Sequence, residues 1–530
     1  MKEYVVVLKR DADPSDFQAD MTQTTGRSDS TSAGLPYSIP SRSIDIANPR
    51  LKSKRSTHYA LEDNEVEQIK QDHRVVDVHI PPDQDESIEI GLDARQDANF
   101  QKPFYNNQNL AFVNWGLRRC IESTNVYSYS TADPGGFYTY NLNGTGVDVV
   151  IQDSGLQTDH PDFYDASGVS RVQNIDWYTE SGVAGTQNAN HNRDFDGHGT
   201  HVGGIAAGLT YGWAKNARIY HVKVSGLNGS GDSGTGIPVS DCFDVIKGWH
   251  NNKPNDPLTG IKRPTIVNMS WGYGTYANNV TTGGSYRGAS ITGWTGTGRD
   301  TSVGIVGSPR YSGSTFLGYR HVNRVSSVDA DVQEMIDAGI HVCIAAGNSY
   351  QKIDVPSGTD YNNYYVNNFG NRYYHRGGSP FDDEAMVVGN VDSIVDGGHG
   401  GVEQKVSSSE NGPGVDIYAP GQNIVSTCST TSRFTGGNYP PNTSFKITTL
   451  GGTSMASPQV CGVGALILQT NPHMTPAELK AFIIGQSVGS MLHTTGLDDD
   501  YADSRSIKGG NNRYLKNPFP SEDVFKITHS

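Results

Sequence analysis

The chain has 530 residues, 35% hydrophobic and 18% charged, a balance that supports a large buried core and, by length, about two to four domains. Its net charge is -15 and it has no Lys/Arg-rich run, which argues against a duplex-DNA binder, so we expect no nucleic-acid partner. No apolar stretch has transmembrane length, so no membrane span is expected, and the short apolar run near the N-terminus does not suffice for a secretory signal.

Residues 1–80 alternate strand and helix patterns and predict a small α+β domain. We expect strands at Tyr4–Leu8, Tyr59–Leu61 and Val75–Ile80, and helices at Asp13–Met21 and Asp63–Asp72. Residues 81–112 follow, rich in Asp, Gln and Asn with three prolines, and they predict a linker with little regular structure.

Residues 113–486 have a different character, because apolar runs typical of buried strands alternate with helical segments. The expected strands are Val147–Ile151, Ile219–Val224, Thr265–Met269, Val342–Ala346 and Met386–Val388. The expected helices are His201–Gly208, Asp329–Ala338 and Ser457–Gln469. This alternation predicts one α/β domain with a central, mostly parallel sheet flanked by helices, followed by a polar tail at 487–530.

The five cysteines include no C-x-x-C pair, so a zinc site is not expected. Cys343 and Cys461 lie in apolar runs and are expected in the core. Whether two of the remaining three, Cys120, Cys242 and Cys428, form a disulfide stays open at this point.

Three short segments carry residues suited to nucleophilic catalysis. VVIQDSGLQTDHPDF places Asp153 directly after an apolar strand, and DFDGHGTHVGGIAAG places His198 in a glycine-flanked turn before a helix. TLGGTSMASPQV places Ser454 after two glycines, where a long helix begins. A serine hydroxyl needs a base, histidine is a suitable base near neutral pH, and a carboxylate can orient that histidine.

Each of these residues also has an ordinary structural interpretation. Asp153 could cap a helix or form a turn, His198 could be a structural histidine, and Ser454 could be an N-cap. Three such segments in one chain, in this order, favour the catalytic interpretation.

The segments DSGLQTDHPDF, GHGTHVGG and GTSMASP resemble the aspartate, histidine and serine motifs of the subtilisin-like serine proteases, the subtilases, in that family's chain order. The resemblance extends through most of residues 113–486 and is of the proteinase K type, without the loop after His201 that binds calcium strongly in some members. It implies a subtilisin-like fold and a serine endopeptidase that acts on polypeptides without a cofactor. We assign no metal ligand, and structural calcium stays open.

The resemblance also implies roles for single residues. Asp153, His198 and Ser454 take the triad roles, and HVCIAAGNS makes Asn348 the donor to the oxyanion. IVNMSWG and LNGSGDS resemble the strands on either side of the substrate. The implied substrate-binding residues are Ser270, Trp271 and Gly272 on the first strand, and Gly229, Ser230 and Gly231 on the second, for which an ordinary loop is the alternative.

The N-terminal segments YVVVLK and HYALEDNEVEQIKQDHRVVDVHIPP resemble the inhibitory propeptide of many subtilases. The resemblance implies that residues 1–80 assist folding and occupy the cleft in cis. The chain would then be a zymogen, with autocatalytic cleavage within 81–112, before AFVNWGLRRC. An unrelated permanent domain is the alternative.

Two stretches depart from the family pattern. Residues 275–322 and 361–378 are inserts that should flank the cleft, as lids, exosites or plain surface loops. Among rival functions, an esterase predicts a G-x-S-x-G elbow, which the residues around Ser454 lack. The other rival is an inert protease-fold protein held by residues 1–112, and an intracellular or virus-associated location stays open.

Overall fold

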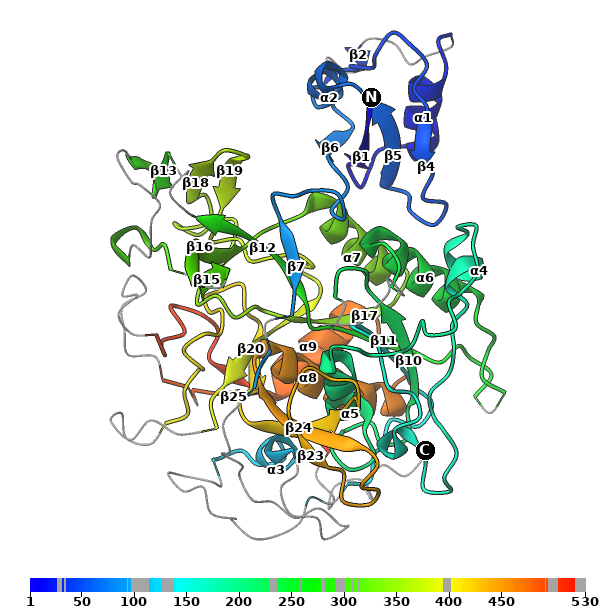
Figure 1. Cartoon of the computed structure of the whole chain (residues 1–530), viewed down its shortest axis with the longest axis vertical. Coiled ribbons are helices and arrows are strands. Elements are labelled where there is room, and N and C mark those ends of the chain that lie inside the picture. Colours follow the sequence, from blue (N-terminus) through cyan, green and yellow to red (C-terminus); the bar gives the residue numbers. More distant parts are fainter. Residues whose placement is uncertain are drawn as a thin grey trace.

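The computed structural model shows a small N-terminal unit above a large α/β domain (Figure 1). The structure describes residues 1–25, 31–32, 35–92, 94–96, 114–125, 138, 140–227, 236–257, 259–277, 282–291, 301–306, 308–312, 314–393, 402–490, 492–493 and 504–519.

The N-terminal unit is an antiparallel sheet in the order β4-β5-β1-β6 with two helices packed on it. Its strands are β1 (Lys2–Leu8), β4 (Ile46–Asn48), β5 (Ser56–Leu61) and β6 (Val75–His79), and its helices are α1 (Pro14–Thr22) and α2 (Asp63–Ile69). Asp13 caps α1, because its side chain accepts from the backbone N–H groups of Ser15 and Asp16. All five predicted elements are present, joined by β4 and by a short pair, β2 (Thr31–Ser32) and β3 (Leu35–Pro36).

The large domain is built on an eight-stranded sheet in the order β10-β9-β11-β17-β20-β21-β26-β25. Every pairing is parallel except the last. The strands are β9 (Asp148–Asp153), β10 (Arg218–Lys223), β11 (Thr265–Met269), β17 (His341–Ala345), β20 (Met386–Val391), β21 (Ile417–Pro420), β25 (Val488–Gly489) and β26 (Arg513–Tyr514). The predicted α/β class with a mostly parallel sheet is therefore confirmed.

The C-terminal tail belongs to this sheet, which the polar sequence did not predict. Tyr514 in β26 and the adjacent Leu515 are fully buried, and Leu515 N–H donates to the carbonyl of Tyr418. Two apolar side chains in a polar segment suffice to attach it, because they fill the space beside β21.

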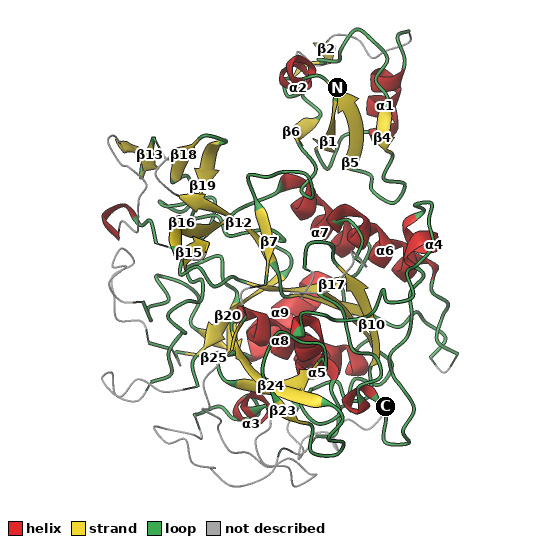
Figure 2. Ribbon diagram, viewed as in Figure 1, coloured by secondary structure: helices red, strands yellow, loops and turns green. Residues whose placement is uncertain are grey.

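Helices cover both faces of the sheet (Figure 2). One face carries α5 (His198–Ala207), α8 (Thr453–Thr470) and α9 (Pro476–Gln486), and the other α6 (Val239–Asn252) and α7 (Ser326–Asp337). Each face has its own apolar core, with Val149, Val202 and Val460 in one and Val150, Val245 and Val332 in the other. Successive residues of β9 thus contribute to opposite cores, as strand geometry requires. Two shorter helices are α3 (Trp115–Arg119) and α4 (Trp177–Ser181).

The two inserts form sheets rather than loose loops. β12 (Gly272–Ala277) lies between β16 (Thr315–Val322) and β7 (Glu89–Gly91), and β15 (Ser308–Ser312) pairs with β16. A second sheet joins the inserts in the order β14-β13-β18-β19, with β13 (Gly283–Tyr286), β14 (Ala289–Ile291), β18 (Tyr364–Asn367) and β19 (Gly370–Tyr373). A third contains β22 (Ile424–Cys428), β23 (Gly437–Asn438), β24 (Lys446–Gly451) and β8 (Arg95–Gln96).

The prediction of little regular structure for residues 81–112 is wrong for β7 and β8, since both pair with strands of the large domain. All five cysteines are buried and free, so the disulfide left open by the sequence is not formed. Among the described helices, none has the length and apolar character needed to cross a membrane.

Candidate active site

Asp153 and His198 meet at the carboxyl edge of the parallel sheet. Asp153 is the last residue of β9, and His198 is the first of α5, which begins after Gly197. Both side chains are fully buried, and His198 Nδ1 lies 2.8 Å from Asp153 Oδ1, which also accepts from the N–H of Ser154 at 2.7 Å. The carboxylate therefore fixes one nitrogen of the imidazole and leaves Nε2 at the other end of the ring.

Asp194, which the sequence reasoning did not single out, organises the turn before His198. Its carboxylate accepts from Ser154 Oγ at 2.9 Å, Gly197 N at 2.8 Å and Thr200 N at 2.8 Å. Ser154 Oγ in turn accepts from the N–H of Gly199 at 2.9 Å. This buried carboxylate thus connects the end of β9 to the start of α5. In the sequence, the feature that could have drawn attention to Asp194 is its position four residues before His198.

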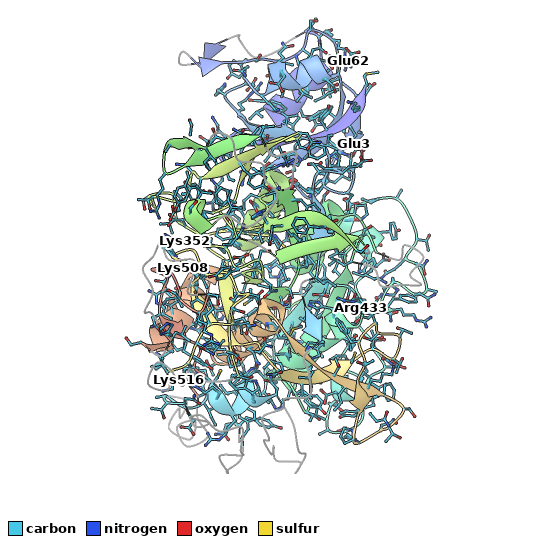
Figure 3. The ribbon with its side chains drawn as sticks, turned by 60° about the vertical axis from the view of Figure 1, so that its left-hand side comes forward. Glu3, Glu62, Lys352, Arg433, Lys508 and Lys516 are labelled. Atoms are coloured by element: carbon cyan, nitrogen blue, oxygen red, sulfur yellow. The ribbon has the colours of Figure 1, made fainter. Side chains whose placement is uncertain are left out.

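The surroundings of His198 favour its protonated form. Burial alone would lower the pKa of His198, but the negative charge of Asp153 and its hydrogen bond outweigh burial and raise the pKa above its ordinary value. Asp196 adds a smaller effect in the same direction. Arg433, labelled in Figure 3, donates to Asp196 at 2.6 Å and opposes it slightly.

Ser454 lies in the first turn of α8, directly after β24. Its Oγ donates to the carbonyl of Ser270 at 3.1 Å, and Ser270 Oγ donates back to the carbonyl of Ser454 at 2.9 Å. Ser270 follows β11, the neighbour of β9, so Ser454 is held at the same sheet edge as Asp153. His198 Nε2 is buried and has no hydrogen-bond partner among the described residues. In this structure the hydroxyl of Ser454 therefore bonds to Ser270 and not to His198.

Asn348 follows β17 and faces the start of α8. Its Oδ1 accepts from the N–H of Thr453 at 2.9 Å, while Thr453 Oγ1 accepts from the N–H of Gly347 at 3.1 Å. Gly347 has φ +113°, and a Cβ there would lie 2.9 Å from Glu410 Cγ, so glycine is required before Asn348. Because Oδ1 of Asn348 accepts from Thr453 at the start of α8, the amide oxygen faces that helix and the Nδ2 group of Asn348 points away from the helix.

The predicted residues Ser270, Trp271 and Gly272 line a small hollow together with Asn348 and Ser454. Its free volume is about 30 Å³, room for about two water molecules. Trp271 is buried, and its ring packs against those of Phe243 and Tyr273. The other predicted substrate-binding residues, Gly229, Ser230 and Gly231, lie outside the described residues.

Two short strands from the N-terminal side of the chain, β7 and β8, pair near this edge. β7 pairs antiparallel with β12, with Gly91 opposite Gly272, and β8 pairs antiparallel with β24, with Arg95 opposite Gly451. Gly91 also lines the hollow that holds Ser454. Two short segments that are close in sequence thus pair with strands next to Ser454, β7 with β12 and β8 with β24.

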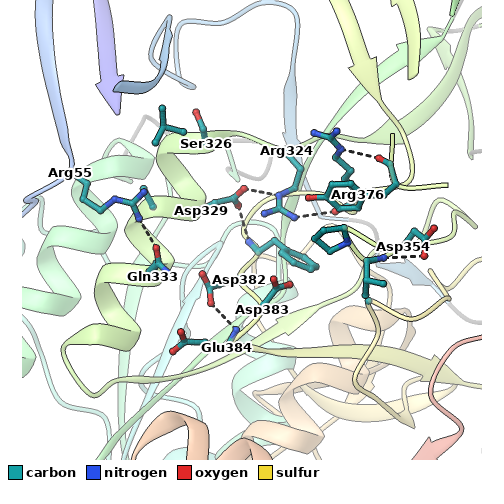
Figure 4. Close-up of a pocket in the computed structure, with 17 residues that line it drawn as sticks. Arg55, Arg324, Ser326, Asp329, Gln333, Asp354, Arg376, Asp382, Asp383 and Glu384 are labelled. Atoms are coloured by element: carbon teal, nitrogen blue, oxygen red, sulfur yellow. Dashed lines mark hydrogen bonds and ion pairs between the residues drawn. The ribbon is translucent and has the colours of Figure 1, made fainter. Parts of the chain in front are cut away.

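A larger hollow among the described residues lies elsewhere. Its volume is about 400 Å³, and it lies between α7, the N-terminal unit and residues 354–384 (Figure 4). Among the charged groups around it, Arg324 forms an ion pair with Asp329 at 2.6 Å, and Arg55 donates to Gln333. Within the described residues, no group of three His, Cys, Asp or Glu side chains is arranged to hold a metal ion.

Two further histidines of the motifs are structural. His201 Nε2 lies 3.1 Å from the carbonyl of Ile424, and His160 Nε2 lies 3.1 Å from that of Lys446. Burial lowers the pKa of His201 to about 3, so it stays neutral.

Comparisons with known proteins identify the family to which the chain belongs. Residues 144–510 match the subtilase family. A subtilisin-like serine protease of Cochliobolus lunatus is 26% identical over 75% of this chain and 59% of its own length, and one of Penicillium citrinum is 27% identical over 75% and 65%. The chain thus spans less than two thirds of the length of these relatives.

A crystal structure of fervidolysin from Fervidobacterium pennivorans, described as a keratinolytic enzyme related to subtilisin, is similar in fold. The TM-score is 0.50 at 15% identity, over 97% of this chain and 60% of that one. Since the family match covers more than half of its residues, the chain belongs to the subtilase family.

Proposed function

We propose that this protein is a serine endopeptidase that hydrolyses polypeptides through an acyl-enzyme and is made as a self-cleaving zymogen. Ser454 attacks the scissile carbonyl, and His198 Nε2 takes the proton from its Oγ. Asp153 holds the imidazole and stabilises its charged form. Asn348 Nδ2 and the Ser454 N–H donate to the oxyanion of the tetrahedral intermediate.

The later steps use the same groups. His198 returns its proton to the leaving amine as the C–N bond breaks, which leaves the acyl group on Ser454. Water then attacks the ester carbonyl while His198 accepts its proton, and Ser454 is regenerated with a free carboxylate product. The bond from Ser454 Oγ to the carbonyl of Ser270 must open first, and a 3.1 Å neutral bond is weak enough to allow this.

The observation that carries the zymogen proposal is the path of residues 89–96. The pairing of β7 with β12 and of β8 with β24, together with Gly91 in the hollow that holds Ser454, supports a segment bound as an added strand, the way proteases hold peptide substrates. Within the expected range 81–112, we therefore propose that cleavage occurs at one of the bonds between Gly91 and Arg95. Residues 1–80 would then act as a propeptide bound in cis.

The test compares the wild-type chain with Ser454→Ala and with Ser407→Ala, which removes the hydroxyl of an exposed serine. Mass spectrometry should find a new N-terminus within residues 92–95 in the wild type and Ser407→Ala, and only intact chain in Ser454→Ala. A fluorophosphonate probe should label Ser454 after processing. Full processing of purified Ser454→Ala would contradict self-cleavage, and persistent absence of labelling would support the inert alternative.

A further inference from the structure

The loop that follows β17 and carries Asn348 is held from two sides. On one side, the N–H of Thr453 in α8 donates to Asn348 Oδ1, and Thr453 Oγ1 accepts from the N–H of Gly347. On the other side, the segment between β20 and β21 contributes Glu410, which is fully buried. No step of the proposed reaction uses this carboxylate, so its burial beside the loop must have another cause.

The carboxylate of Glu410 lies where two N–H groups of the loop converge. Its Oε1 accepts from the N–H of Ser349 at 3.1 Å, and its Oε2 accepts from the N–H of Gln351. Tyr350, between these two residues, has φ 65°, in the left-handed region that residues with a side chain rarely adopt. Successive N–H groups around such a residue form a concave anion-binding site, so a carboxylate is a group that this turn suits.

Glu410 also bonds to the residue on the other side of Asn348. Its backbone N–H donates to the carbonyl of Gly347 at 2.9 Å, and a Cβ at Gly347 would lie 2.9 Å from its Cγ. Together with the bond to Ser349, one residue thereby holds the peptide groups immediately before and after Asn348. Thr453 holds the side-chain amide of Asn348, and Glu410 holds its backbone.

The rate of the reaction depends steeply on where an oxyanion donor lies. Such a donor has to lie about 2.7–3.1 Å from the developing oxygen, and a misplacement of about 1 Å can cost about 100-fold in rate. A left-handed residue other than glycine is strained and persists only where its surroundings hold it. Without the carboxylate, the turn at Tyr350 is free to relax, and Asn348, two residues earlier, moves with it.

We propose that Glu410 is a positioning residue that holds Asn348 in place to bind the oxyanion. The inference rests on the proposed endopeptidase function, in which Asn348 Nδ2 is the donor. A carboxylate has no N–H or O–H group to donate, so Glu410 acts through Asn348 and not on the oxyanion itself. The effect of removing its bonds should therefore depend on the presence of the Asn348 amide, which a merely structural role would not require.

The test compares kcat and KM of processed Glu410→Gln, Asn348→Ala and the double variant on one fluorogenic peptide. Each variant is incubated until mass spectrometry shows complete processing, and its rate is divided by the amount of Ser454 that a fluorophosphonate probe labels, so unfolded enzyme does not count. Glu410→Gln keeps the size of the side chain but turns an amide NH₂ toward one of the two N–H groups, so kcat should fall about tenfold with KM nearly unchanged. In the Asn348→Ala background, the same substitution should change kcat by less than about twofold.

The matched control is Glu403→Gln, which alters another buried carboxylate of the same segment, one that accepts from Arg119 at 2.8 Å. It should lower the melting temperature and leave kcat close to that of the wild type. The inference is overturned if the effects of Glu410→Gln and Asn348→Ala simply multiply in the double variant, or if Glu410→Gln has an unchanged or higher kcat. Failure of Glu410→Gln to process, when Asn348→Ala does process, would also overturn it.

The proposed function is judged separately, on the wild type. If the wild type cleaves the peptide and its Ser454 is labelled, the endopeptidase proposal survives every result for Glu410. No cleavage and no labelling of the wild type would overturn both proposals.

Discussion

Arg50 is predicted to control how long the N-terminal unit stays bound after the chain is cut. It belongs to the loop between β4 and β5 and enters the space between α6 and α7 of the large domain. Its Nε donates to Asp244 at 2.8 Å, and its Nη2 donates to Asp331 at 2.9 Å and to the carbonyl of Ser240 at 3.2 Å. The perturbation is Arg50→Ala, which removes every one of these bonds.

The expected magnitude follows from burial. The side chains of Arg50, Asp244 and Asp331 are at most 2% exposed, so removing Arg50 takes a buried cationic partner from both carboxylates. Asp244 keeps its ion pair with Lys247 at 3.2 Å, and the greater part of the loss falls on Asp331. Such a truncation costs about 3–5 kcal/mol. The dissociation constant of the N-terminal unit should therefore rise by about two to nearly four powers of ten. Arg10 is the control, because its ion pair with Asp337 joins the same two units but is 54% and 39% exposed.

The assay is a dilution series of the processed enzyme with a fluorogenic peptide, which reports the fraction of enzyme that has lost its N-terminal unit. Arg50→Ala should reach full activity at concentrations at which the wild type is still inhibited. Arg10→Ala should shift the curve by less than about fivefold, since exposed pairs contribute at most about 1 kcal/mol. Coincident curves for the wild type and Arg50→Ala would refute the reasoning.

Three further predictions concern the active site. Asn348→Ala should lower kcat about 100- to 1000-fold with little change in KM, and a change confined to KM would argue against oxyanion stabilisation. Because the pKa of His198 is raised, kcat/KM should fall with acidification from a pH above 6.5, where His198 protonates. Asp153→Asn should shift this acidic fall of kcat/KM to lower pH and lower kcat about 10⁴-fold. If the acidic fall does not shift, a group other than His198 titrates there. Asp194→Ala leaves the hydroxyls of Ser154 and Thr200 and two backbone N–H groups without their acceptor, so thermal unfolding should show a loss of about 3 kcal/mol, and an unchanged melting temperature would contradict this role.

The sequence predicted those parts of the molecule whose signals are local. A buried strand is a run of apolar residues, so the five core strands were found within a few residues of their observed ends. Asp153 directly follows such a run, and glycines flank His198 and precede Ser454, so their chemistry could be proposed without a fold. Asn348 was assigned through the resemblance of HVCIAAGNS to a subtilase segment, and it follows the run that forms β17.

Other features depend on partners far away in the chain, and no local pattern indicates them. β7 is short and half-buried, and what makes it a strand is its pairing with β12, about 180 residues later. Arg320 lies in a stretch rich in glycine, serine and tyrosine, and only the register of β16 on β12 brings it to the hollow that holds Ser454. Arg50 gave no signal either, because its carboxylates come from two separate helices.

The N-terminal unit is attached to the large domain in two physically different ways, and cleavage acts on only one of them. Cutting a bond between Gly91 and Arg95 breaks the covalent connection between β7 and β8, so the two strands can leave separately. The contacts of Arg50 with Asp244 and Asp331 contain no peptide bond that Ser454 could reach. The appearance of activity should therefore lag behind the cut, and the lag should depend on α6 and α7 rather than on the chemistry at Ser454. In Arg50→Ala the lag should disappear while the rate of cutting stays the same.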